Sequence, residues 1–175
     1  KSGPEALVSD NTIHITTCRE TTDALPTAGL SICGIDIQAK IFAVGNRISG
    51  GDAGVLFFHL PTFNPTNVAI VNTSIDNARY GVWFMNYFAH RQFGAARASG
   101  VLFNGVTITD PLVAGIYLED QPTGDGPVTI TSLGITVQGG PVGLLKHGPR
   151  AVVNGALNLT GQTVQPIKTE AGAIQ

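Results

Sequence analysis

A short motif recurs along this chain, in which glycine is followed by an apolar residue, any residue and a second apolar residue. Its copies are Gly54-Val55-Leu56-Phe57, Gly81-Val82-Trp83-Phe84, Gly115-Ile116-Tyr117-Leu118, a weaker Gly143-Leu144-Leu145-Lys146 and a candidate earlier copy, Gly34-Ile35-Asp36-Ile37. From Gly54 to Gly143 the glycines are 27, 34 and 28 residues apart. Such self-similarity is typical of repeat folds, in which one unit buries its apolar face against the next.

A second element precedes each glycine. It is an apolar, strand-like segment interrupted by a polar residue, which is Asn46, Asn72, Asn104 or, in the fourth copy, Ser132. Alternation of apolar residues at a period of two indicates β-strands. Asn and Gly accept the left-handed backbone conformation that tight bends need. The two elements therefore predict stacked coils of short parallel strands, with a ladder of asparagines at one bend.

Composition supports an all-β chain. The 175 residues fit a single domain, and the hydrophobic fraction of 43% with only 13% charged residues excludes a disordered chain. The 22 glycines agree with many bends. No segment keeps the apolar spacing of an amphipathic helix over about 12 residues, so helical crossovers are not expected.

The strand, asparagine, strand and Gly-Ile-x-Phe-like recurrence resembles the single-chain right-handed parallel β-helix of pectate-lyase-like proteins, and phage tailspikes are similar. The resemblance implies a short β-helix of about five or six coils. We expect an N-terminal capping segment at residues 1–29, the β-helix at residues 30–160 and a C-terminal tail or cap at residues 161–175. A β-sandwich or jelly roll is the alternative fold, although sandwiches lack an ordered repeat of this kind.

Alternation along the strands assigns side chains to faces. If the apolar pairs such as Val55 and Phe57 point inward, one outward column contains Leu56, Trp83, Tyr117 and Leu145, and the next contains Phe58, Met85 and Glu119. An outward apolar column of this length usually marks an interface. We expect Leu56, Phe58, Trp83, Met85, Tyr117 and Leu145 to form the contact of a homotrimer. A saccharide platform on Trp83 and Tyr117, or a covering loop or tail, is the alternative.

Candidate chemistry is sparse. The acids that could serve polysaccharide cleavage are Glu119, Asp120 and Asp76, of which the adjacent Glu119 and Asp120 point to opposite faces of a strand. Ligand contacts are expected from Trp83 and Tyr117, and from Arg79, Arg91 and Arg97 in or near a loop inserted in the longest repeat. The alternatives are a local ion pair of Asp76 with Arg79, and a loop that packs on a neighbouring subunit.

Several classes of partner have no support. The formal net charge of −2 without a basic stripe argues against nucleic acid, and no apolar run is long enough to span a membrane. The four histidines show no ligand spacing and Cys18 and Cys33 form no metal motif, so no metal or cofactor is predicted. The sequence leaves open whether these two cysteines are thiols or a disulfide. No signal peptide is visible.

The expected function follows from the resemblance and the outward column. It is a structural or adhesion component of a virion, of the phage tailspike or surface-protein type. Such a component would be a homotrimer that presents loops to a host-surface polysaccharide or binds other virion proteins, located in the virion or outside the cell. The alternatives are a polysaccharide-active enzyme, either glycoside hydrolase or lyase, and an architectural capsid decoration protein.

Overall fold

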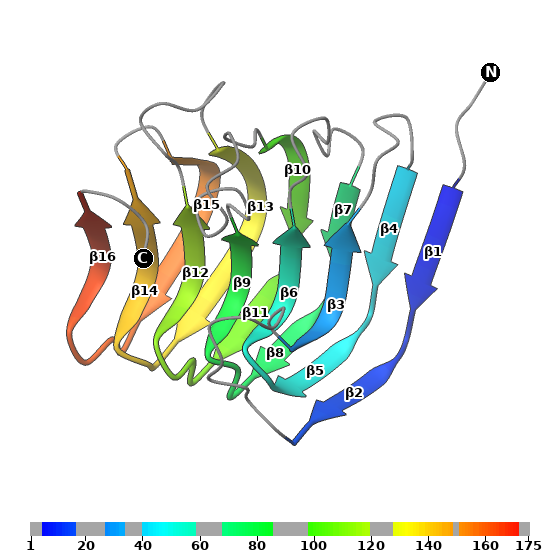
Figure 1. The fold of residues 1–175 in the computed structure, drawn as a ribbon, viewed down its shortest axis with the longest axis horizontal. Coiled ribbons are helices and arrows are strands. Elements are labelled where there is room, and N and C mark those ends of the chain that lie inside the picture. Colours follow the sequence, from blue (N-terminus) through cyan, green and yellow to red (C-terminus); the bar gives the residue numbers. More distant parts are fainter. Residues whose placement is uncertain are drawn as a thin grey trace.

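The structure, a computed structural model, describes residues 5–16, 27–33, 40–58, 68–85, 98–119, 128–148 and 151–171 (Figure 1). Within these ranges it contains only strands and bends, and all strand pairs are parallel. The strands are β1 (Glu5–Ser9), β2 (Thr12–Ile15), β3 (Ala28–Cys33), β4 (Lys40–Val44), β5 (Arg47–Gly50), β6 (Ala53–Phe58), β7 (Val68–Val71), β8 (Ser74–Asp76), β9 (Tyr80–Met85), β10 (Ala98–Asn104), β11 (Val106–Thr109), β12 (Ala114–Glu119), β13 (Val128–Gln138), β14 (Val142–His147), β15 (Val152–Thr160) and β16 (Gln165–Glu170).

The strands wind in a fixed order through two sheets (Figure 1). Each of the first four coils contributes two strands to the larger sheet and one to the smaller sheet, β3-β6-β9-β12-β14-β16. In the last two coils, the long strands β13 and β15 run through both halves of the larger sheet. The described residues therefore form a parallel β-helix of six coils, as predicted. The parallel pairing excludes the antiparallel sandwich that was the alternative.

The coil extends further than the sequence analysis predicted. Residues 5–15 were assigned to an N-terminal capping segment, but β1 and β2 pair with β4 and β5 as the first coil. Residues 165–170 were assigned to the tail, but β16 pairs with β14 as the last strand of the smaller sheet. The last coil has Pro166 in place of the motif glycine, and the sequence analysis overlooked the first coil's copy of the motif at Gly29.

The motif glycines stack on one another because no side chain fits there. A Cβ atom on Gly81 would lie 2.6 Å from the carbonyl oxygen of Gly115 and 2.5 Å from Cγ2 of Ile108. The strand pairing skips these glycines, so the chain makes a local kink and the alternation of faces shifts by one residue. In the first coil the residue stacked next to Gly54 is Gly29, so the earliest described copy of the motif begins there. Gly34, the candidate from the sequence analysis, lies outside the described residues.

Left-handed residues align at the two bends of the larger sheet, but the expected asparagine ladder does not form. At the first bend the aligned residues with positive φ are Asp10, Gly45, Asn72 and Gly105, and at the second they are Gly50, Asn77, Asp110, Gly139 and Gly161. Asn104 pairs with Val71, one position before Asn72, and Asn46 comes one position after Gly45. Gly, Asn and Asp are interchangeable at such bends, so asparagine spacing alone cannot give the register.

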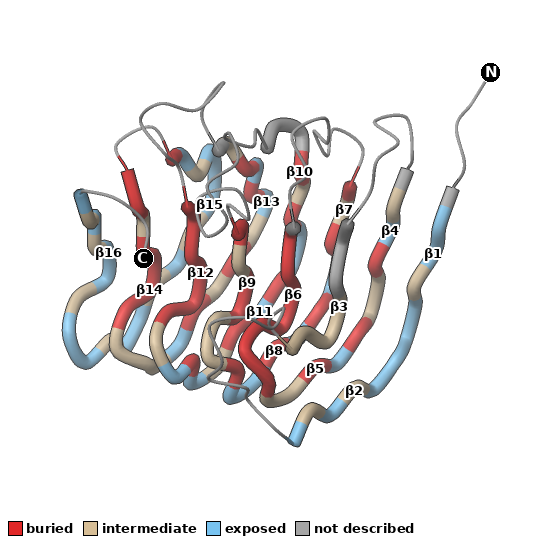
Figure 2. The backbone as a smooth tube through the Cα atoms, in the orientation of Figure 1, coloured by how far each residue is buried: buried red, intermediate tan, exposed pale blue. Residues whose placement is uncertain are grey.

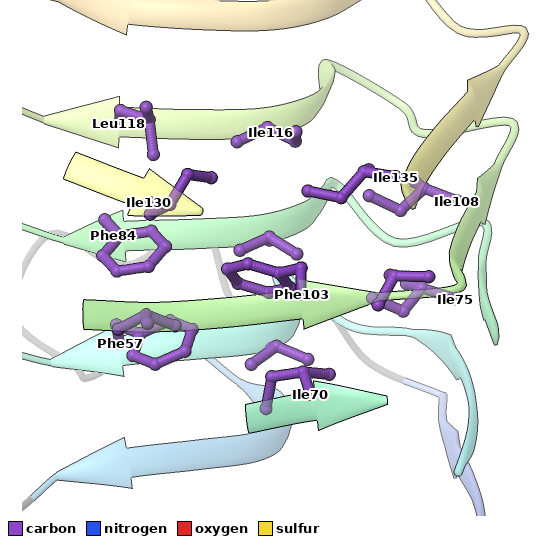
Figure 3. Packing of buried hydrophobic residues seen from close by; sticks show 14 of the residues in the cluster. Phe57, Ile70, Ile75, Phe84, Phe103, Ile108, Ile116, Leu118, Ile130 and Ile135 are labelled. Carbon is purple, nitrogen blue, oxygen red and sulfur yellow. The ribbon is translucent and has the colours of Figure 1, made fainter. Parts of the chain in front are cut away.

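The core runs along the axis of the coil and is made of inward residues from both sheets (Figure 3). The rings of Phe57 and Phe84 stack with centroids 4.2 Å apart, and Phe103 packs against both with its edge from the opposite sheet. Residues Val55, Phe57, Val82, Phe84, Ile116 and Leu118 are fully buried, as the alternation predicted. Figure 2 shows that burial is greatest in the middle coils and weakens at both ends. The described residues include no helix that could cross a membrane.

Candidate functional site

Three aromatic rings meet on the outer face of the smaller sheet. Trp83 of β9 and Tyr117 of β12 are paired in register, and their ring centroids are 5.9 Å apart. Tyr80 completes the group, with its ring centroid 4.9 Å from each of the other two. We call Tyr80, Trp83 and Tyr117 the aromatic cluster. The predicted outward column of Leu56, Trp83, Tyr117 and Leu145 is confirmed as a run of register partners.

Tyr80 was missed by the sequence analysis because of the kink at Gly81. Three positions separate Tyr80 from Trp83, and strict alternation would place them on opposite faces. Because the kink at Gly81 shifts the alternation by one residue, Tyr80 lies on the outer face and packs with Trp83 and Tyr117. The glycine motif contained the signal, because every copy of it introduces the same shift.

A buried carboxylate lies against this cluster. Glu119 is only 2% exposed, and the indole Nε1–H of Trp83 donates a hydrogen bond to its Oε1 at 2.8 Å. Burial is the main cause that raises the pKa of the Tyr117 hydroxyl, and the nearby charge of Glu119 adds to it. Burial also raises the pKa of Tyr80, although the Arg79 cation opposes that change. Of the two predicted catalytic candidates that the structure describes, Glu119 and Asp76, it is Glu119 that lies against the aromatic residues.

Arg79 joins the edge of the same site. Its guanidinium carbon lies 5.6 Å from the centroid of the Tyr80 ring, a cation–π arrangement. Asp76 lies on β8 in the other sheet, and its Oδ2 accepts a hydrogen bond from Asn77 Nδ2 at 2.8 Å. The structure therefore separates Asp76 from Glu119, and among the described residues no ion pair joins Asp76 to Arg79. Asp120, Arg91 and Arg97 lie outside the described residues.

The row that contains Glu119 continues with two further titratable residues. Glu119 is the register partner of His147, which is the partner of Glu170. His147 Nδ1 lies 3.8 Å from Glu170 Oε2, and Lys168 Nζ lies 2.5 Å from Glu170 Oε1. We call Glu119, His147 and Glu170 the polar row. The sequence analysis missed Glu170 because it assigned that residue to the tail, and it had no register with which to place His147.

The polar row has the residue types for general acid and base chemistry. Glu119 and Glu170 are two coils apart, which corresponds to backbone positions about 9.5 Å apart at the usual strand spacing. Carboxyl groups in inverting glycosidases are about 6.5–9.5 Å apart. In the described parts of the chain, no group of three or more His, Cys, Asp or Glu side chains is placed to hold a metal ion.

Most of the predicted interface column is buried within the single chain. Leu56 is 2% exposed, Met85 7%, Tyr117 8% and Leu145 6%, while Trp83 is half-buried. Nothing is described of the Phe58 side chain. These residues pack in two small clusters with alanines, Val142 and Tyr80. In the single chain the outward column is therefore not an open apolar stripe, and its role as a trimer contact stays a prediction.

An exposed apolar face lies elsewhere, on the first half of the larger sheet. Its seven apolar residues are Leu7, Phe42, Ala69 and Leu102 in one column and Val44, Val71 and Leu133 in the next, where the polar Asn104 lies between Val71 and Leu133. Leu7 is 69% exposed, Phe42 42% and Leu133 63%. We call these seven residues the apolar sheet face. It contains no charged residue, whereas the second half of the same sheet is polar outside, with Arg47, Ser74 and Thr107 in one column.

Comparison of the chain with protein-family models, with curated proteins and with solved structures gave no match.

Proposed function

We propose that this chain is a saccharide-binding structural component of a virion, of the phage tailspike or surface-protein type. The aromatic cluster is the single observation that carries this proposal. Aromatic rings present flat apolar surfaces that pack against the C–H faces of sugar rings. The half-buried rings of Tyr80 and Trp83 lie beside the half-buried Arg79, so apolar and polar contacts are available together. Arg79 suits an acidic sugar, because guanidinium binds carboxylate in a bidentate manner.

The hydrogen bond from Trp83 to Glu119 supports this role. It fixes the indole ring across a coil boundary, with the donor and the acceptor on neighbouring strands. A ring held in one orientation loses little freedom when a ligand binds, which improves affinity. Rigid strands also position a site more accurately than loops do. The β-helix would therefore present a preformed platform to a polysaccharide on the host surface.

The same component is proposed to act as a homotrimer. The apolar sheet face supports this, because large exposed apolar surfaces usually mark interaction sites. Closed cyclic symmetry is the ordinary way for identical chains to bury one such face. This moves the proposed interface from the outward column of the smaller sheet to the larger sheet, where Leu7 and Phe42 are exposed.

Two variants separate the binding site from the interface. Trp83→Ala should lower the affinity for a bacterial surface polysaccharide at least 10-fold without changing the molecular mass in analytical ultracentrifugation. In dilute samples, Phe42→Lys should reduce the mass from trimer to monomer and leave the affinity per site unchanged. Trp83→Phe is the matched control for the hydrogen bond, because it keeps a ring but removes the Nε1–H donor. Full binding by Trp83→Ala, or a monomeric wild type, would contradict the corresponding part of the proposal.

A second candidate function is hydrolysis of the bound polysaccharide, and the polar row favours it. In this role Glu119 and Glu170 would serve as the acid and the base of an inverting mechanism, in which water attacks the anomeric carbon as the glycosidic oxygen takes a proton. The test is release of reducing ends from capsular polysaccharide or lipopolysaccharide. Glu119→Gln and Glu170→Gln should each abolish release, while Asp76→Asn should not. Activity that survives both substitutions would remove the polar row from catalysis.

A further inference from the structure

The C-terminal end of the coil leaves inward-facing apolar residues open. Ile167 of β16 is 52% exposed, although its register partner Leu144 is 4% exposed and Ile116, in the same column, is 0% exposed. Val153 and Leu159 of β15 are only partly buried against the core. Figure 2 shows exposed and half-buried segments along β15 and β16, beside the buried middle coils. One more coil would bury this surface.

The N-terminal end has the same character. Ile13 of β2 and Leu30 of β3 are only partly buried against the core, and Ala6 of β1 is exposed. Their register partners are Ile48, at 2% exposure, Val55, at 0%, and the half-buried Ile41. The inward side of the first coil therefore lacks a layer of the core, just as the last coil does.

The two ends fit each other because the strand register is kept through all six coils. If a first coil follows a last coil by the same step that relates successive coils, Ile167 comes opposite Leu30 and Leu159 comes opposite Ile13. By the same rule Val153 comes opposite Ala6. All three pairs are apolar and point into the core.

We propose that the C-terminal coil of one copy of this chain binds the N-terminal coil of a second copy, in parallel and in register, so that both sheets continue across the joint. The unpaired backbone groups of both end coils would gain hydrogen-bond partners, and such open edges are known templates for association. The contact is heterologous, with different surfaces on the two copies, so it propagates into a filament. This proposal rests on the end coils alone and is independent of saccharide binding.

The polar residues beside the joint do not oppose it. In the same register Asn158 comes opposite Thr12, and Thr160 comes opposite His14. Gln165 comes opposite Ala28 in the smaller sheet. None of these pairs sets like charges against each other, which would be destabilising across neighbouring strands.

The test uses one variant for each end. Ile167→Lys places a charge in the C-terminal side of the joint, and Ala6→Lys does the same on the N-terminal side. Both sites are exposed in the single chain, so the variants should fold, which circular dichroism and thermal melting verify. Sedimentation velocity of the wild type should show a mass that grows with concentration beyond that of the proposed trimer, because end-to-end contacts join one trimer to the next. Neither variant should show this growth, because an unpaired charge in a buried joint is costly.

Mixing the two variants gives the decisive result. The Ala6→Lys copy keeps an intact C-terminal end and the Ile167→Lys copy keeps an intact N-terminal end, so their equimolar mixture should double in mass and grow no further. Leu112→Lys is the matched control, since Leu112 is 57% exposed, lies in the bend before β12 of the fourth coil and is not part of the apolar sheet face, and it should associate like the wild type. A wild type whose mass does not grow up to about 100 μM, growth that persists in either variant, or a mixture that does not double would overturn the proposal.

Discussion

Single residues of this fold are selected by space and by backbone conformation, and the two reasons apply at different positions. The stacked glycines at residues 29, 54, 81, 115 and 143 do not have a left-handed φ, so they are required because neighbouring coils leave no room for Cβ. Asn72 and Asp110 do have a positive φ, at 47° each, and they hold bends that other residues resist. The sequence analysis recognised both residue types but assigned one reason to both.

Crowding at the glycine stack can be tested with a pair of substitutions. Gly81→Ala would place Cβ 2.6 Å from the carbonyl oxygen of Gly115, which cannot move without shifting the next strand. We expect the free energy of unfolding to fall by about 1–3 kcal/mol in urea titrations, as for other overpacked sites. Gly29→Ala should cost less, because its closest backbone atom is 3.1 Å away and only the Ile48 side chain must move. Equal losses at the two sites would show that space is not the cause.

Strands are the elements that the sequence could predict, because alternation within one strand needs no knowledge of its neighbours. That is why the inward Val82 and Phe84 and the outward Trp83 were assigned correctly. Register between coils depends on how many residues each bend uses, and bend residues are interchangeable. The predicted asparagine ladder was wrong for this reason. For the same reason the sequence analysis could not place Glu170 beside His147.

The packing of the strands makes a prediction about the phenylalanine core. Phe84 is fully buried and its ring packs against those of both Phe57 and Phe103, so Phe84→Ala should lower the free energy of unfolding by about 3–5 kcal/mol. Phe42→Ala is the control from the outer surface, where the side chain is 42% exposed, and it should cost much less. Chemical denaturation at a protein concentration where the chain is monomeric measures the free energy of unfolding of both variants. A small loss at Phe84 would mean that the two sheets do not share one core.

Across the whole molecule, the coil tolerates repeats of different length without losing its register. The motif glycines are separated by 27, 34 and 28 residues, yet their strands pair at the same positions. Residues added between strands do not disturb the stack, and the aromatic cluster of Tyr80, Trp83 and Tyr117 lies entirely on strands β9 and β12. The candidate site could therefore be predicted in part, from Trp83 and Tyr117, but not its third ring.

Burial of two tyrosines predicts how stability depends on pH. Folding raises the pKa of Tyr80 and Tyr117 above the ordinary value of 10.0, so the folded protein holds these protons more tightly than the unfolded chain. Stability should be unaffected by these groups below pH 10. Above it, stability should fall by up to about 1.4 kcal/mol per pH unit for each tyrosine. Urea midpoints at pH 8 and pH 11 measure this, and Tyr117→Phe should show a smaller fall. If Tyr117→Phe and the wild type showed the same pH dependence, the raised pKa of Tyr117 would not be a cause of the fall in stability.

The central claim is that successive turns of the chain are stacked in register, and a row of outward residues tests it directly. Thr12, Arg47, Ser74, Thr107, Thr136 and Asn158 lie in successive coils. With Cys18 and Cys33 replaced by serine, nitroxide pairs would join Asn158 to Ser74, Arg47 or Thr12, in samples diluted with unlabelled protein. Electron paramagnetic resonance should give backbone separations of about 14, 19 and 24 Å, an even step of about 4.8 Å per coil. Separations that fail to rise in this order, as antiparallel hairpins would produce, would contradict the stacked coil.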